Sequence, residues 1–173
     1  MATAVREKSR SDGIHEKCGD RLSLALWLQL MKCTKEMEAG VGGMLRRGHG
    51  QSLARFDVLS QLYRFDGNWA TVGAIAENVM ASSGNITALL DRMVGEDLIV
   101  RRASPSDRRS HQIRMTKKGA ALFGEMTDDH VIWVDAALDG IDRKKKKLLT
   151  ALLVEVRNTF VENAATAEKG NVK

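Results

Sequence analysis

The sequence predicts a mainly α-helical chain that carries one small two-stranded β-hairpin. Pro105 is the only proline among 173 residues, so long periodic segments run without a helix breaker. Apolar residues recur every three or four positions over most of the chain, and this spacing becomes an alternation only near residues 99–115. With 43% hydrophobic residues, the chain has enough apolar side chains to build a core.

The first long helix is predicted from Asp20 to Leu45, after a polar and flexible arm over residues 1–19. One apolar stripe of this helix consists of Leu22, Leu26, Leu30, Cys33, Met37, Val41 and Met44, and a second consists of Leu24, Trp27, Leu28 and Met31. A helix that is apolar on two faces needs two packing partners. We therefore expect one face to pack within its own domain and the other against a second subunit.

Three shorter helices are predicted after a basic, glycine-containing break at residues 46–50. They cover residues 53–65, 72–80 and 83–96, and their expected N-caps are Ser52, Thr71 and Ser82. Their expected buried positions are Phe56, Leu59, Leu62 and Tyr63 in the first helix, and Ile86, Leu89, Leu90 and Met93 in the third. Asp66-Gly67-Asn68 is typical of a turn.

The hairpin and two further helices complete the prediction. Residues 99–102 and 111–115 are expected to be strands, joined by the polar turn 103–110. Thr116 is expected to cap a helix over residues 117–138, and Asp142 to cap a last helix that ends near Ala165. The inner residues of these two helices are predicted to be Leu122, Met126, Trp133 and Ala137, and Leu148, Leu149, Leu152, Leu153, Val156 and Phe160.

The composition favours a nucleic-acid partner and a reducing compartment. A net charge of +5 and a pI of about 9.4 suit a polyanionic partner. Cys18 and Cys33 form no CxxC pair and no disulfide framework, so we expect a cytoplasmic protein. Residues 1–17 contain no apolar segment and no later apolar run is long enough to span a bilayer, so we expect neither a signal peptide nor a membrane anchor.

The helix over residues 83–96 is predicted to bind DNA. Ser82, Ser83, Asn85, Thr87 and Arg92 lie at its start or away from its apolar stripe. Small polar side chains let a helix enter the major groove, where Asn can pair with adenine and Ser or Thr with bases or phosphates. The alternative interpretation is that Ser82, Ser83 and Asn85 only cap the helix.

The hairpin, here called the wing (residues 99–115), is predicted to be a second contact with DNA. Seven basic residues and one acidic residue, Asp107, lie between positions 101 and 118. Arg108, Arg109 and Ser110 at its turn suit phosphates and a narrow minor groove, and Asp107 can orient a neighbouring arginine. The alternative is a charged hairpin that only contacts solvent.

Residues 107–119 resemble the D-x-R … L-T-x-x-G signature of the MarR family of winged helix-turn-helix regulators. Asp107, Arg109, Thr116 and Gly119 match this signature, and Met115 stands where leucine is usual. The resemblance extends upstream through residues 83–93 to Leu98-Ile99, and the order of helices matches from about residue 20 to residue 162. It implies a homodimer that binds a palindromic, inverted-repeat operator in double-stranded DNA, with Arg109 in the minor groove.

The resemblance also implies a domain organisation and an effector. The expected parts are an arm (1–19), a dimerisation helix (20–50), a winged helix-turn-helix DNA-binding region (51–116), C-terminal dimerisation helices (117–165) and a tail (166–173). MarR-like regulators usually respond to a small molecule, often an aromatic acid, that binds between the dimerisation helices and the DNA-binding region. The candidate ligand-binding residues are Trp27, Met31, Arg46, Arg47, His49 and Phe56.

Four short segments resemble one branch of the family, the repressors of phenylpropanoid degradation that hydroxycinnamoyl-CoA thioesters release. These segments are Leu26-Trp27-Leu28, Arg55-Phe56-Asp57, residues 84–87, and the pair His130 and Trp133. The branch implies an effector such as feruloyl- or p-coumaroyl-CoA and control of aromatic catabolism genes. Arg46 and Arg47 would then bind the CoA phosphates. The alternative is that Trp27 belongs to the dimer core and that the basic cluster is solvated or contacts phosphate.

Other functions have weaker support in the sequence. A thiol-based peroxide sensor of the same family would use Cys18, whereas Cys33 lies on an apolar stripe and is expected to be buried and inert. The four histidines have no metal-ligand spacing, and we expect no metal or other cofactor. An enzyme is not expected, because no catalytic grouping is visible. A DNA-binding architectural protein that responds to no ligand is the alternative from another class.

Overall fold

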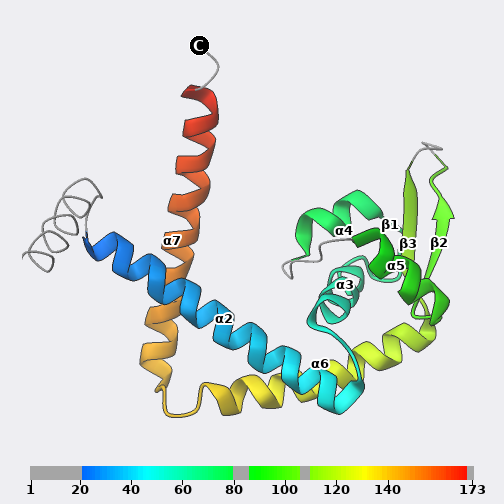
Figure 1. Cartoon of the computed structure of the whole chain (residues 1–173), viewed down its shortest axis with the longest axis horizontal. Coiled ribbons are helices and arrows are strands. Elements are labelled where there is room, and N and C mark those ends of the chain that lie inside the picture. The colour runs from blue at the N-terminus through cyan, green and yellow to red at the C-terminus, as the bar shows by residue number, and fades with distance from the viewer. Residues whose placement is uncertain (1–20, 80–85, 106–109, 171–173) are drawn as a thin grey trace, which may run out of the picture. The chain divides into compact units, whose positions relative to one another are not determined.

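The computed structural model describes residues 21–79, 86–105 and 110–170 of the chain. The chain divides into two compact units, one that ends at His130 and one that begins at Val131. The first unit contains α2 (Arg21–His49), four further helices or parts of helices, and all described strands. The second contains the end of α6 (Lys117–Ala137) and the whole of α7 (Arg143–Gly170). Figure 1 shows the order of these elements along the chain.

Helix α2 is longer than the sequence predicted. The break expected at residues 46–50 is wrong, because the helix continues to His49 and ends at Gly50, which has a positive φ of 63°. The backbone N–H groups of Gly50 and Gln51 donate to the carbonyls of Arg46 and Leu45 and so close the last turn. Arg46 and Arg47 therefore belong to the last helical turn, where positive charge is favourable beside the free carbonyl groups.

The three short helices begin close to the predicted residues. Helix α3 (Leu53–Tyr63) has Ser52 as its N-cap, and Ser52 Oγ accepts from the Arg55 backbone N–H at 3.3 Å. Helix α4 (Val72–Asn78) has Thr71 as its N-cap, and Thr71 Oγ1 accepts from the Ala74 backbone N–H at 3.1 Å. Both caps are confirmed, whereas the Ser82 cap lies outside the described residues. In α5 (Ile86–Gly95) Leu89, Leu90 and Met93 of the predicted stripe are buried, whereas Ile86 is partly exposed.

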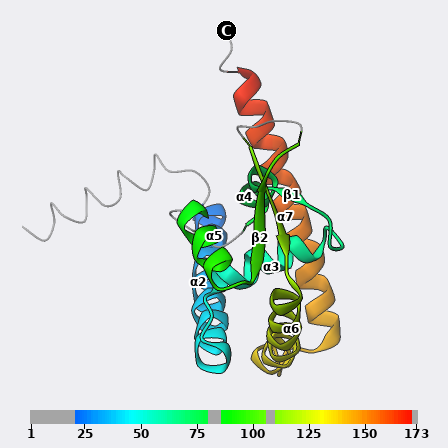
Figure 2. The same ribbon diagram turned by 90° about the vertical axis from the view of Figure 1, so that its right-hand side faces the viewer.

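The sheet has three strands instead of the expected two. Strands β2 (Ile99–Ala103) and β3 (His111–Met115) form the predicted antiparallel hairpin, which extends away from the helices of its unit (Figures 1 and 2). The additional strand β1 (Ala70–Thr71) pairs antiparallel with β3, with Ala70 opposite Ile113, so the order is β1-β3-β2. Two residues are too few to show the alternation that reveals a strand in a sequence.

The core of the first unit connects its helices to the sheet. Helix α6 begins after Thr116, whose Oγ1 accepts from the Gly119 N–H at 2.9 Å, so this predicted cap is confirmed. Fully buried side chains come from α2, α3, α4, α5, the strands and α6: Leu45, Val58, Leu59, Ile75, Leu90, Met93, Ile99, Ile113 and Met126. The stripe of α5 thus packs inward, which leaves its other face available.

The second unit contains a long helix with an exposed apolar stripe. Asp142 Oδ1 accepts from the Lys145 N–H at 2.9 Å, which confirms the predicted cap, and α7 runs to Gly170, beyond the predicted end at Ala165. Residues predicted to be inside are instead exposed in the single chain: Leu148, Leu149, Leu152, Leu153 and Phe160. No helix in the described ranges combines the length and apolarity needed to cross a membrane.

The first two thirds of α2 are exposed in the same way. Leu22, Leu26 and Met37 of one predicted stripe, and Leu24, Trp27, Leu28 and Met31 of the other, are all exposed. Only its last third contributes buried residues, which include Val41 and Leu45. Cys33 was expected to be buried and is exposed, as are Leu26 and Met37 of the same stripe. Large exposed apolar surfaces of this kind are typical of interfaces.

Candidate nucleic-acid interface

Helix α5 exposes a polar face beside the sheet. Because Leu89, Leu90 and Met93 are buried, Thr87 and Arg92 lie on the exposed side. Of the predicted DNA-binding residues at this helix, Ser82, Ser83 and Asn85 lie outside the described residues. The described part of the helix therefore has the orientation that major-groove contact requires, with its apolar side held in the core.

An ion pair joins this helix to the wing. The Arg101 guanidinium on β2 donates to Asp91 Oδ1 on α5 at 2.8 Å, and both side chains are partly exposed. Exposed ion pairs add little to stability, typically about 0 to 1 kcal/mol. This ion pair nevertheless restricts how the hairpin can move relative to α5, because it links β2 directly to that helix.

The base of the wing carries a cation–π cluster that the sequence analysis missed. The Arg102 guanidinium lies 4.0 Å and that of Arg114 4.9 Å from the centre of the Trp69 ring. Gln112 Oε1 also accepts from two nitrogens of Arg102, at 3.0 and 2.9 Å. Stacking on an aromatic ring is worth about 0.5–1 kcal/mol at exposed sites. The cluster holds two positive charges on one face of the sheet.

Strand alternation explains which arginines form this cluster. Arg102 is paired with Gln112 across the hairpin, and Arg114 follows two residues later on the same face, whereas Ile99 and Ile113 point to the buried face. Trp69 directly precedes Ala70, which pairs with Ile113. The alternation in β3 was visible in the sequence, but the proximity of Trp69 required the unpredicted strand β1.

The turn of the wing is described only at its two ends. The backbone N–H of Ser104 donates to the carbonyl of Ser110 at 3.0 Å, so the hairpin pairing continues past the strands. Ser110 is partly buried. Asp107, Arg108 and Arg109, which the sequence predicted to orient and form the DNA contact, lie outside the described residues.

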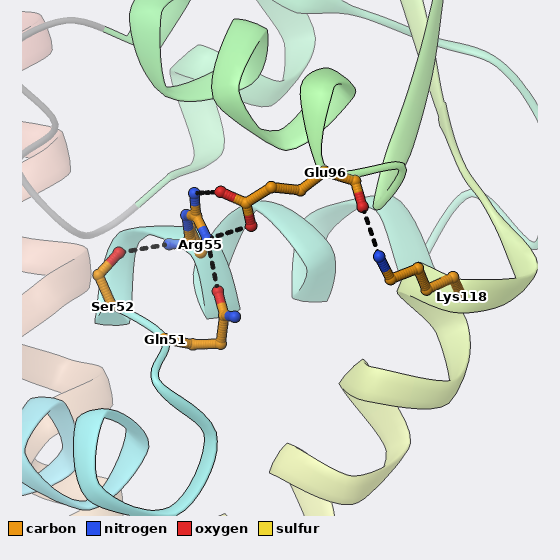
Figure 3. Close-up of polar contacts among 5 residues, drawn as sticks. All are labelled: Gln51, Ser52, Arg55, Glu96 and Lys118. Carbon is orange, nitrogen blue, oxygen red and sulfur yellow. Dashed lines mark hydrogen bonds and ion pairs between the residues drawn. The ribbon is translucent and has the colours of Figure 1, made fainter.

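Arg55 connects α3 to the residues that follow α5 (Figure 3). Its guanidinium contacts both carboxylate oxygens of Glu96, with 2.7 Å between Nη1 and Oε2, and Nη1 also donates to Gln51 Oε1 at 2.9 Å. Lys118 Nζ donates to the Glu96 carbonyl at 2.8 Å. The hydrogen bond from Arg55 lowers the pKa of Glu96. Burial opposes this shift, and the charges of Arg55, Lys118 and Arg92 add to it.

A cavity of about 390 Å³ lies between α2, α3 and α6 in the first unit. Its lining residues are Thr34, Met37, Glu38, Val41, Leu53, Phe56, Asp57, Ser60 and His130. The His130 and Phe56 rings meet edge to face, with 5.1 Å between their centres, and burial lowers the pKa of His130. A cavity of this size and mainly apolar lining suits a small organic ligand.

Among the predicted ligand-binding residues, only Phe56 lines this cavity. Trp27 and Met31 lie about half exposed, nearer the start of α2 than the cavity. Arg46 and Arg47 are exposed in the last turn of α2, and their guanidiniums fold back over Gly42 and Gly43. His49 Nε2 lies 2.9 Å from Asp129 Oδ2 and so joins the end of α2 to α6. Within the described part of the chain, no group of three or more His, Cys, Asp or Glu side chains could hold a metal ion.

Comparisons with known proteins agree with this architecture. The MarR family model matches residues 52–111, which run from the N-cap of α3 to the first residue of β3. The HTH-type transcriptional regulator MhqR of Bacillus subtilis (strain 168) is 26% identical over 134 residues, 78% of this chain and 90% of its own length. The HTH-type transcriptional regulator PecS of Dickeya dadantii (strain 3937) is 30% identical over 113 residues, 65% of this chain and 68% of its own.

A solved structure extends the similarity to a DNA complex. The transcriptional repressor CouR, bound to a 23-mer DNA duplex, has a TM-score of 0.66 and 27% identity to this chain. The similarity covers 79% of this chain and 94% of that one. The relatives are thus HTH-type transcriptional regulators, which agrees with the expectation that the chain is not an enzyme.

Proposed function

This chain belongs to the MarR family of DNA-binding transcriptional regulators, and we propose that it is a homodimeric repressor that a small aromatic effector releases from an inverted-repeat operator. The observation that carries the proposal is the exposed polar face of α5 beside a wing of concentrated positive charge. The similarity to CouR, a repressor bound to duplex DNA, supports the same assignment.

Two kinds of contact account for DNA binding. The wing, with Arg108 and Arg109 at its turn, supplies charge for phosphates and for the minor groove. Ser83 and Asn85, which precede α5 in the sequence, and Thr87 in its first turn supply the groups that distinguish bases in the major groove. Ser82, Arg92 and Ser110 flank these two regions and are proposed to bind phosphates.

The exposed apolar faces of α2 and α7 support a homodimer. Seven large apolar side chains of α2 and five of the predicted inner residues of α7 are exposed in the single chain, and burial in an interface would remove them from water: Leu22, Leu24, Leu26, Trp27, Leu28, Met31, Met37, Leu148, Leu149, Leu152, Leu153 and Phe160. A two-fold dimer would place two α5 helices on successive major grooves, about 34 Å apart. An inverted repeat is the matching operator.

The cavity is the proposed effector site. It lies between α2, an expected dimerisation helix, and α3, whose Arg55 is tied to Glu96 at the end of α5. An effector that favours another arrangement of these helices would shift the population toward a spacing that no longer fits one DNA turn. The effector class proposed from the sequence is an aromatic acid or its CoA thioester, with Arg46 and Arg47 binding the CoA phosphates.

The sequence also left two alternative functions open. A thiol-based peroxide sensor would depend on Cys18, and an architectural DNA-binding protein would need no ligand. Neither accounts for an apolar cavity with titratable residues in its wall. The cavity therefore favours an effector-responsive regulator, whereas control of aromatic catabolism genes is proposed from the sequence resemblance alone.

A combined screen tests the proposal. Aromatic acids and their CoA thioesters are added to the dimer, and both the melting temperature and the affinity for the operator are measured. The proposal expects at least one compound to raise the melting temperature and lower DNA affinity. If no such compound does either while DNA binding is intact, effector control is contradicted. The double variant Arg46→Ala with Arg47→Ala should keep DNA binding and lose only the response to thioesters.

A further inference from the structure

The cation–π cluster at the base of the wing lies on the exposed face of the sheet. Because side chains alternate along a strand, Gln112 and Arg114 lie on the face opposite the fully buried Ile113. Arg102 pairs with Gln112 across the hairpin and lies on the same exposed face. Both arginines are exposed, whereas Trp69 is partly buried. The cluster therefore presents two positive charges on a surface that the core of its unit does not use.

No carboxylate among the described residues forms an ion pair with either arginine of this cluster. The ion pairs in the described ranges involve other cations, and their acidic members are Asp91, Glu96, Asp129 and Asp142. The two guanidiniums lie 4.0 and 4.9 Å from one ring centre, so their separation is below the screening length of about 10 Å in 0.1 M salt. Like charges held this close repel each other, and a bound anion would relieve the repulsion.

The contacts around Arg102 leave part of its guanidinium available to a ligand. Gln112 Oε1 accepts from Nε and Nη2 of Arg102, at 3.0 and 2.9 Å, whereas no described residue accepts from Nη1 within hydrogen-bond distance. Stacking on the Trp69 ring restricts the plane of this guanidinium. A planar guanidinium of fixed direction offers its N–H donors in the geometry that phosphate oxygens accept. The ring thus orients a group that is suited to a phosphate.

We propose that this face of the sheet is a phosphate-binding surface for duplex DNA, in which Arg102 and Arg114 contact backbone phosphates and Trp69 positions their guanidiniums. The inference rests on the proposed DNA-binding function and adds a contact that the turn of the wing and α5 do not supply. Charge and continuity identify the occupant, because β2 and β3 lead directly into the turn that is proposed to enter the minor groove. Phosphate contacts carry no sequence information, so this surface strengthens binding to any duplex and leaves the choice of operator to other residues.

Charge-removing variants test the phosphate contacts. Arg102→Gln and Arg114→Gln change exposed side chains and keep most of their length, so both variants should fold normally. Fluorescence anisotropy over a range of salt concentrations measures their affinity for two duplexes. One is an operator that the wild-type protein selects from a random-sequence library, and the other is a scrambled duplex of the same length. Each variant should weaken binding to both duplexes at least about threefold and lower the salt slope by about 1.

Variants of Trp69 test its positioning role. Trp69→Leu keeps the net charge and an apolar side chain but removes the ring, so it should weaken binding to both duplexes about threefold, whereas Trp69→Tyr should retain most of the affinity. In a Trp69→Leu background, Arg102→Gln should cost less than about twofold, because the ring acts through the arginine. A ring that only stabilised the fold would lower the melting temperature, and its loss would multiply in full with that of Arg102→Gln.

The control is Arg143→Gln, which removes the same charge from the exposed first turn of α7 and should leave the affinity for both duplexes unchanged.

Three results would overturn the inference. These are an unchanged affinity and salt slope in the double variant Arg102→Gln with Arg114→Gln, a loss of affinity confined to the operator, and a double variant Trp69→Leu with Arg102→Gln whose loss equals the product of the two single losses. A wild-type protein that binds neither duplex contradicts the proposed function, whereas arginine variants that bind as tightly as the wild type contradict only this inference.

Discussion

Arg55, in the first turn of α3, forms a two-pronged ion pair with Glu96, the residue that directly follows α5 (Figure 3). The next residue after Arg55 is Phe56, which lines the cavity. One short contact therefore joins the wall of the proposed effector site to the end of the helix proposed to enter the major groove. The Arg55 side chain is largely buried, at 14% exposure, whereas Glu96 is 46% exposed.

The first prediction concerns the energy of this pair. A double-mutant cycle with Arg55→Ala and Glu96→Gln should give a coupling of about 1 kcal/mol in the free energy of unfolding, the upper range for partly exposed pairs. Denaturant titration measures it. Glu77→Gln, which removes a charge from the exposed side of α4, should show no coupling to Arg55→Ala. A coupling near zero for the Arg55–Glu96 pair would show that the contact does not connect the two helices energetically.

The second prediction concerns the pH dependence of the same pair. The hydrogen bond from Arg55 lowers the pKa of Glu96 below its usual 4.5, so the folded state binds this proton less readily than the unfolded state. The pair should therefore contribute fully to stability above pH 4.5, and this contribution should be lost as the pH falls through the lowered pKa. Titration of Glu96 by NMR measures the shift. In Arg55→Ala the pKa should return toward its usual value, and an unchanged pKa would contradict the assigned cause.

The third prediction concerns two glycines on α6 that should respond in opposite directions to the same substitution. A Cβ atom at Gly119 would overlap the carbonyl oxygen of Leu98, whereas one at Gly124 would meet nothing within 4 Å. Gly124→Ala should stabilise the helix by about 0.5–1 kcal/mol, the usual gain at an exposed helical position. Gly119→Ala should destabilise the chain, because the backbone at Leu98 or Gly119 would have to move to relieve the overlap. Thermal unfolding of both variants tests this, and a stable Gly119→Ala would contradict the packing of α6 on β2.

The fourth prediction concerns the proposed dimer. Leu149→Glu with Leu153→Glu places two charges on the exposed apolar stripe of α7, and should convert the dimer to monomers in sedimentation velocity. Asn158 lies near the opposite side of the same helix by its 3.6-residue period, so Asn158→Glu should leave the dimer intact. A double variant that remains dimeric would place the interface elsewhere.

Local features were the most predictable from the sequence. Ser52, Thr71, Thr116 and Asp142 all cap the helices predicted for them, because an N-cap depends only on the residue itself and the next three. The stripe of α5 and the two strands of the wing were also predictable, because each has a clear period.

Features that depend on tertiary contact were not predictable. Strand β1 has only two residues, and the contact of the Trp69 ring with Arg102 and Arg114 follows from the pairing of β1 with β3. The cavity brings together residues that lie far apart in the sequence, such as Thr34 and His130. The apolar period of a helix identifies which side is buried, but it does not show where along the helix a cavity lies. For that reason the sequence pointed to Trp27 and Met31 on α2, whereas the cavity lies about one to four turns later, at residues 34–41.

The most direct test of the central claim is the operator affinity of Arg109→Ala, measured by fluorescence anisotropy over a range of salt concentrations. The control is Arg143→Ala, which removes the same charge from the exposed first turn of α7. We predict at least about a tenfold loss of affinity for Arg109→Ala and a salt slope lower by about 1, with the dimer intact and the control unchanged. Unchanged affinity of Arg109→Ala at physiological salt would contradict DNA binding through the wing.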